Sequence, residues 1–140
     1  MKTSDVIAYL DEVFHPEYQE DYDNSGFLFG EGAAPCTGAL VAVDLTPAVV
    51  AEAAEAGLNL IVTHHPFLFG GVKRLTDSTE TGRMVLALAR AGIAVYAAHT
   101  NLDNLPGGVN GALASVLGVG QCRVLQPLAG HSDEGAGPGG

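Results

Sequence analysis

Apolar residues recur along the chain in two patterns, one with the spacing of amphipathic helices and one typical of short buried strands. The amino-terminal segment has helical spacing and predicts a helix that begins at a possible Ser4 cap. Its apolar positions are Val6, Ile7, Leu10, Val13 and Phe14. Thr46 and Pro47 predict a second helix over about 47–56, because a hydroxyl cap followed by proline is a helix start.

The remaining apolar segments alternate between the two patterns. Two more helices are predicted, one closed by Gly92 and one, after Gly107 and Gly108, closed by Gly118. Strands are predicted at residues 39–44, 58–63, 93–99 and 122–126. Alternating strands and helices indicate βαβ units, so we expect an α/β fold with a mainly parallel sheet and helices packed on it.

The domain organisation follows from a change in composition near the end of the chain. Residues 1–128 carry the periodic segments and form one α/β unit, whereas residues 129–140 are rich in glycine without apolar periodicity. We expect that final segment to be disordered.

Charge and composition exclude several classes of function. The formal net charge of −10 would repel a phosphate backbone, so nucleic acid is an unlikely partner. No apolar run reaches the roughly 18–20 residues that cross a bilayer. Acidic residues in the first helix, such as Asp5 and Asp11, do not fit a secretory signal, and Cys36 and Cys122 lack partners at metal-ligand spacing. We therefore expect a cytoplasmic protein with reduced thiols.

Metal-binding residue types lie at the ends of three successive predicted strands. Asp44 ends the first, the second runs into His64 and His65, and the third runs into His99 and Asp103. In open α/β sheets, ligands bind at the carboxyl ends of the strands. Imidazole and carboxylate are ligands for zinc, iron, cobalt and manganese, so the sequence predicts a metal site at this edge.

The adjacent histidines indicate how many ions the site holds. In a continuing strand, neighbouring side chains point to opposite faces, so His64 and His65 would serve two ions better than one. Pro66 favours an extended conformation at His65. We therefore expect a dinuclear site with ions about 3.5–4 Å apart.

Local structural roles compete with these interpretations. His64 and His65 could donate to carbonyl groups at a strand end, and Asp103 could form an Asx-turn or cap the next helix. His99 is equally compatible with orienting a ligand, with general acid–base chemistry and with a core position. Asp44 fits helix initiation, and the DNSG segment at 23–26 fits a turn.

Five stretches together resemble one known family over residues 1 to about 128. They read YDNSGFLFG, VAVDLTPAVVAEA, NLIVTHHPFLF, YAAHTNLDNLPGGVN and LASVLG. The chain resembles the amino-terminal half of the NIF-three-like family, the type 2 GTP cyclohydrolase I homologues. The resemblance implies two divalent metal ions, a homohexamer, and metal ligands at His64, His65 and Asp103.

The chain departs from the family pattern near its carboxyl end. Family members continue into a second half that adds a histidine and, four residues on, a glutamate to the metals. His131 and Glu134 are three residues apart in the glycine-rich segment, so those roles are not carried over to them. We therefore expect a truncated form of the fold, with a fragment, a frameshifted product and half of a split protein all open.

Two classes of function remain. One is a two-metal hydrolase in which His99 moves a proton, with a purine nucleotide as the substrate that the family's name implies. No Walker-type loop or basic cluster selects GTP. The other is a non-catalytic metal-binding or protein-interaction scaffold, or an inactive fragment.

Overall fold

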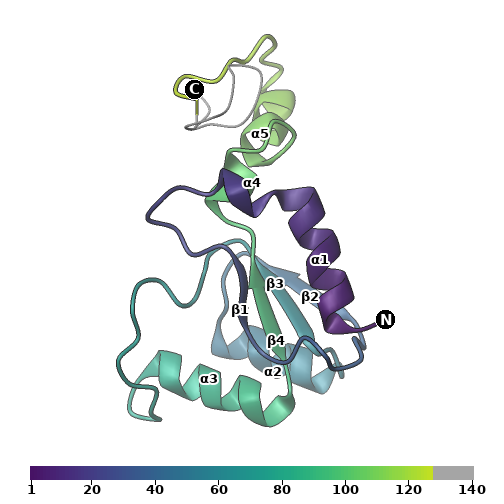
Figure 1. Ribbon diagram of the computed structural model, residues 1–140, viewed down its shortest axis with the longest axis vertical. Helices are drawn as coiled ribbons and strands as arrows, with labels where there is room; N and C mark the ends of the chain where they lie inside the picture. Colours follow the sequence, from purple (N-terminus) through teal and green to yellow (C-terminus); the bar gives the residue numbers. More distant parts are fainter. Residues whose placement is uncertain (128–140) are drawn as a thin grey trace.

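Four strands form one sheet in the computed structural model, which describes residues 1–127. They are β1 Gly26–Phe29, β2 Ala39–Ala42, β3 Leu60–Thr63 and β4 Ala94–Ala97. The order across the sheet is β1-β4-β3-β2, with β2, β3 and β4 parallel and β1 antiparallel to β4 (Figure 1). The mainly parallel α/β fold is confirmed, and the segment expected to be disordered, 129–140, lies outside the described residues.

Residues 1–127 also form six helical segments: α1 Thr3–Phe14, the 3-10 turn η1 Pro16–Tyr18, α2 Pro47–Glu55, α3 Glu80–Ala91, α4 Thr100–Asp103 and α5 Val109–Leu117. Of these, α2 and α3 connect parallel strands. As predicted, the Thr46 hydroxyl caps α2 by accepting from the Val49 amide at 3.2 Å. The expected Ser4 cap is wrong, because α1 begins at Thr3 with Lys2 as its N-cap, and the Lys2 amide donates to Asp5 at 2.7 Å. In the described part of the chain, none of the helices has the length and apolarity to cross a bilayer.

Helices cover both faces of the sheet (Figure 1). On one face, α2 and α3 pack against the side chains of Ile61 and Val95, and Leu88 of α3 is fully buried there. On the other face, α1 packs through Ile7 against Leu60 of β3 and Tyr96 of β4. Because β4 lies between β1 and β3 and both its faces are covered, all four of its residues are buried.

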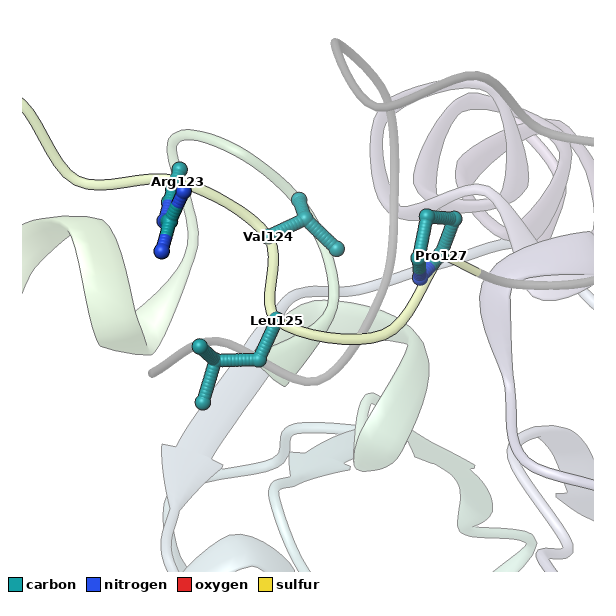
Figure 2. A pocket seen from close by; sticks show the side chains of 4 residues that line it. All are labelled: Arg123, Val124, Leu125 and Pro127. Carbon is teal, nitrogen blue, oxygen red and sulfur yellow. The ribbon is translucent and has the colours of Figure 1, made fainter.

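The sequence misplaces one strand. The fourth strand of the sheet is β1, a four-residue segment before the first predicted strand, and it pairs antiparallel with β4. The strand predicted at 122–126 is wrong, because those residues belong to no strand of the sheet. Figure 2 shows this segment as a loop in which Arg123, Val124, Leu125 and Pro127 line a pocket. Among residues 1–127, the side chains that line this pocket include neither a histidine nor a carboxylate.

Candidate metal centre

The register of the parallel strands brings the predicted site residues to one edge of the sheet. Thr63 pairs with Ala42 of β2 on one side and with Ala97 of β4 on the other. The residues that follow each of these positions therefore leave the sheet side by side, as the sequence predicts. They include Asp44, the two adjacent histidines and His99.

The His64–His65 pair does not continue β3. The strand ends at Thr63, whose hydroxyl donates to the His65 carbonyl at 2.9 Å, while the His65 amide donates to the Val43 carbonyl at 3.0 Å. The chain bends here, and the two ring centroids lie 4.9 Å apart. The premise that the two side chains point to opposite faces is therefore wrong, because it required an uninterrupted strand.

Three imidazoles form a compact cluster. The ring of His99 lies 5.3 Å from that of His64 and 5.6 Å from that of His65, measured between centroids. One nitrogen from each of the three rings lies within 4.8 Å of the others. His99, for which the sequence left three roles open, is therefore part of this histidine cluster.

Each imidazole of the cluster is held at Nδ1 by an oxygen. His64 Nδ1 lies 2.7 Å from the Ala98 carbonyl, and His65 Nδ1 lies 2.7 Å from the Asp44 carboxylate. His99 Nδ1 lies 2.8 Å from the carboxylate of Asp23. Carbonyl and ionised carboxylate groups only accept, so Nδ1 of each ring carries the hydrogen. The lone pair of Nε2 is then free in all three rings, as metal coordination requires.

Asp103 completes the predicted set of side chains. It is the last residue of α4, and its Oδ1 lies 3.7 Å from His64 Nε2. The alternative role as a helix cap is not observed, since α5 begins after Gly108 without a side-chain cap. Gly108 gives the chain the close approach it needs here, because a Cβ at that position would lie 1.8 Å from the Leu102 carbonyl oxygen.

Asp23 anchors His99 from a turn that is distant in sequence. Its carboxylate accepts from the His99 ring, from Thr100, from the Asn24 amide and from the Ser25 hydroxyl. The side chain has no solvent-exposed surface. Burial by itself raises the pKa of the Asp23 carboxyl, but the hydrogen bonds outweigh that effect and hold the pKa well below its usual range. Asp23 is therefore a fixed negative charge behind His99.

Sequence reasoning undervalued both orienting carboxylates. For Asp44 it favoured helix initiation, but Thr46 caps α2 and Asp44 binds His65 instead. For the DNSG segment it favoured a turn, which is observed, but the same turn also holds His99. Their positions in the sequence gave some indication of this role. Asp44 lies at the end of a predicted strand, and Asp23 lies in a turn.

The donor set suits a divalent transition metal. Three imidazoles with free Nε2 atoms and one carboxylate are the ligand types that zinc, iron, manganese and cobalt accept. The outer hydrogen bonds to Asp44, Asp23 and the Ala98 carbonyl are the interactions that fix ring orientation around protein-bound metals. His65 remains half exposed, so water or a ligand can reach the cluster.

The chain matches one protein family over almost its whole length. The family described as Duf34/NIF3 (NGG1p interacting factor 3) matches residues 1–137. A GTP cyclohydrolase 1 type 2 homolog of Clostridium perfringens is 35% identical over 137 residues, covering 98% of this chain and 52% of the relative. The chain thus spans about half the length of that curated relative.

Solved structures of other family proteins have the same fold. Staphylococcus aureus protein SA1388 superposes with a TM-score of 0.83 at 38% identity, over 91% of this chain and 41% of that protein. A Bacillus cereus protein related to NIF3 superposes with a TM-score of 0.85 at 33% identity, over 91% of this chain and 36% of that one. The fold described above therefore corresponds to a part of these longer chains.

Proposed function

The chain belongs to the Duf34/NIF3 family, and from this premise and the histidine cluster we propose that it binds divalent transition metal ions for metal-dependent hydrolysis. The single observation that supports metal binding best is the shared arrangement of three imidazoles. Each donates Nδ1–H to an oxygen and keeps Nε2 free, one nitrogen of each ring lies within 4.8 Å of the others, and His64 Nε2 lies 3.7 Å from Asp103. His64, His65 and Asp103 are the proposed ligands.

We propose two ions per chain, as the family resemblance implies. The cluster nitrogens lie within 4.8 Å of one another, and the Asp103 carboxylate lies beside His64. These distances are compatible with the separation of about 3.5–4 Å between the ions of two-metal sites. Bound divalent ions supply a water of lowered pKa and a Lewis acid for hydrolysis.

His99 is proposed as the proton-transfer residue. Asp23 holds its Nδ1–H, so Nε2 is the atom that accepts or releases a proton next to the ligands. Metal content of a His99→Ala variant separates this role from coordination. Retained metal with lost turnover supports proton transfer, whereas lost metal identifies His99 as a ligand.

Metal content per chain is the first test. Plasma mass spectrometry after reconstitution should find about two transition-metal ions on the wild type and fewer on His65→Ala, because that variant removes one ligand. His15→Asn is the matched control, since His15 binds Glu17 instead of the cluster and asparagine tolerates its left-handed backbone. A folded wild-type chain that retains no metal would overturn the proposal.

The hydrolysis half of the proposal needs a substrate screen. GTP is the first nucleotide to test, because the curated relatives carry the name GTP cyclohydrolase 1 type 2 homolog. Turnover should vanish on chelation and return with added metal. Metal binding without turnover of any nucleotide, ester or phosphate substrate would leave a metal-binding protein and overturn the hydrolase assignment.

A second candidate function is self-association as a homo-oligomer, a hexamer by the family resemblance. The surface of α5 favours it, because this helix contributes no buried residue and exposes apolar side chains. They are Val109, Leu113, Val116 and Leu117. Contiguous exposed apolar side chains are typical of protein interfaces.

A further inference from the structure

Phe69 lies beside the histidine cluster without an evident structural role. Its ring centroid is 6.4 Å from that of His99, with the two rings nearly perpendicular at 87°. The phenyl side chain is 57% exposed, although it is large and apolar. Neither metal coordination nor core packing accounts for an aromatic ring presented to solvent at this position.

The residues on either side of Phe69 fix the position of its backbone. Two residues earlier, Phe67 packs against the core cluster shared by α2 and α3. Between them, the Leu68 carbonyl accepts a hydrogen bond from the Asn24 side chain at 2.6 Å. After Phe69, Gly70 has a φ of +80°, a conformation that lets the chain turn away and that glycine adopts without strain.

One turn therefore positions both the cluster and the phenyl ring. Asp23 binds His99, and the next residue, Asn24, binds the carbonyl that precedes Phe69. The spacing between Phe69 and His99 thus depends on two adjacent residues of the same turn. An exposed aromatic ring fixed at this distance from a cluster of free imidazole nitrogens is suited to contacting whatever those nitrogens bind.

We propose that Phe69 is the aromatic wall of a ligand subsite and stacks on the planar ring of a small molecule whose polar end reaches the metal. This inference rests on the proposed metal binding. A planar aromatic or heteroaromatic ring is the favoured class, because aromatic pairs gain energy at centroid separations of about 4.5–7 Å beyond what apolar burial gives. Phe69 determines ligand specificity here and takes no part in proton transfer.

Two chelators that differ by one ring test the subsite. Benzohydroxamate and acetohydroxamate carry the same metal-binding group, and only the first has an aromatic ring. Isothermal titration of the zinc-loaded wild type should show tighter binding of benzohydroxamate. In Phe69→Ala the benzohydroxamate affinity should fall about tenfold, whereas the acetohydroxamate affinity should not change. Phe69→Trp should retain the preference for the aromatic probe.

Val72→Ala is the matched control, because Val72 is an exposed apolar residue of the same loop. It should leave both affinities as in the wild type. Equal affinities of the two probes for the wild type, or a Phe69→Ala variant that binds both as before, would overturn the subsite. Zinc content is measured first. Absence of zinc would defeat metal binding and the subsite together, whereas bound zinc with no aromatic preference defeats the subsite alone.

Discussion

The three clustered histidines differ in the partner that orients each ring. His64 donates to a neutral backbone carbonyl, whereas His65 and His99 donate to carboxylates. The Asp23 carboxylate is enclosed by donors, but Asp44 is 61% exposed and holds His65 from the surface. His65 therefore depends on the partner that is easiest to remove without disturbing the fold.

Asp44→Ala should weaken metal binding while the fold remains intact. Loss of an outer partner of a metal-bound histidine typically reduces metal affinity about 10- to 100-fold. The free energy of unfolding should change by less than about 0.5 kcal/mol, because Asp44 is exposed and does not cap α2. Competition with a chromophoric chelator measures the affinity.

Asp77→Ala is the control for Asp44, because Asp77 is an exposed aspartate whose backbone carbonyl, not its side chain, accepts from Arg83. Its metal affinity should equal that of the wild type. An Asp44→Ala variant with unchanged affinity would show that the hydrogen bond to His65 is not needed for binding.

At the residue scale, the sequence predicted the cluster residues but not their supports. His64, His65, His99 and Asp103 follow strands whose carboxyl ends must meet, so topology alone brings them together. Asp23 precedes His99 by 76 residues, and nothing local distinguishes it from an ordinary turn residue. The bend at His64 also depends on contacts with Val43, which are not visible in a local pattern.

At the scale of elements, helices were predicted better than strands. The four longer helices have caps, closing glycines or a clear apolar stripe, which are all local signals. β1 has four residues and becomes a strand only because β4 offers it a free edge. Residues 122–126 have the composition of a strand, but none of the strands β1 to β4 pairs with them. Strand formation depends on a distant partner, and the sequence does not show that partner.

A partly buried side-chain contact joins α1 to the interior strand β4. The Tyr96 hydroxyl donates to the Asp11 carboxylate at 2.8 Å, and the ring is fully buried in β4. Burial, together with this hydrogen bond and the negative charge of Asp11, raises the pKa of Tyr96 well above its usual range. The neutral phenol is therefore the form that the folded state requires.

Tyr96→Phe should lower the free energy of unfolding by about 1 kcal/mol at neutral pH. Because the folded-state pKa lies above the unfolded value of about 10, the wild type keeps this contribution below pH 10 and loses it as the pH rises further. Urea unfolding at pH 8 and pH 11 should show the gap between wild type and variant closing. Exposed Tyr22 supplies the control Tyr22→Phe, and a gap independent of pH would contradict the assignment.

At the scale of the whole molecule, α5 is little covered by the rest of residues 1–127, since none of its own residues is buried. Figure 1 shows it beyond α4, away from the sheet. The helix exposes apolar side chains, which favour association between copies of the chain. The net charge of −10 makes the copies repel one another. The surface and the charge therefore act in opposite directions on self-association.

Val116→Glu should reduce self-association, because Val116 is 84% exposed and the new charge would have to be buried in an interface. Sedimentation velocity should show a smaller species than the wild type, with the same thermal midpoint. Glu31→Gln is a surface control that should leave the size unchanged, since Glu31 is an exposed residue far from α5 in sequence. Equal sizes of wild type and Val116→Glu would exclude α5 as the contact.

The histidine cluster is assembled from segments that are far apart along the chain, near residues 23, 44, 64 and 99. In the unfolded chain these segments are separate, so the centre exists only once the sheet has formed. An ion that binds the assembled centre then stabilises the folded state by mass action, increasingly so as its free concentration rises above the dissociation constant. The stability of this protein would therefore depend on its supply of metal as well as on its own contacts.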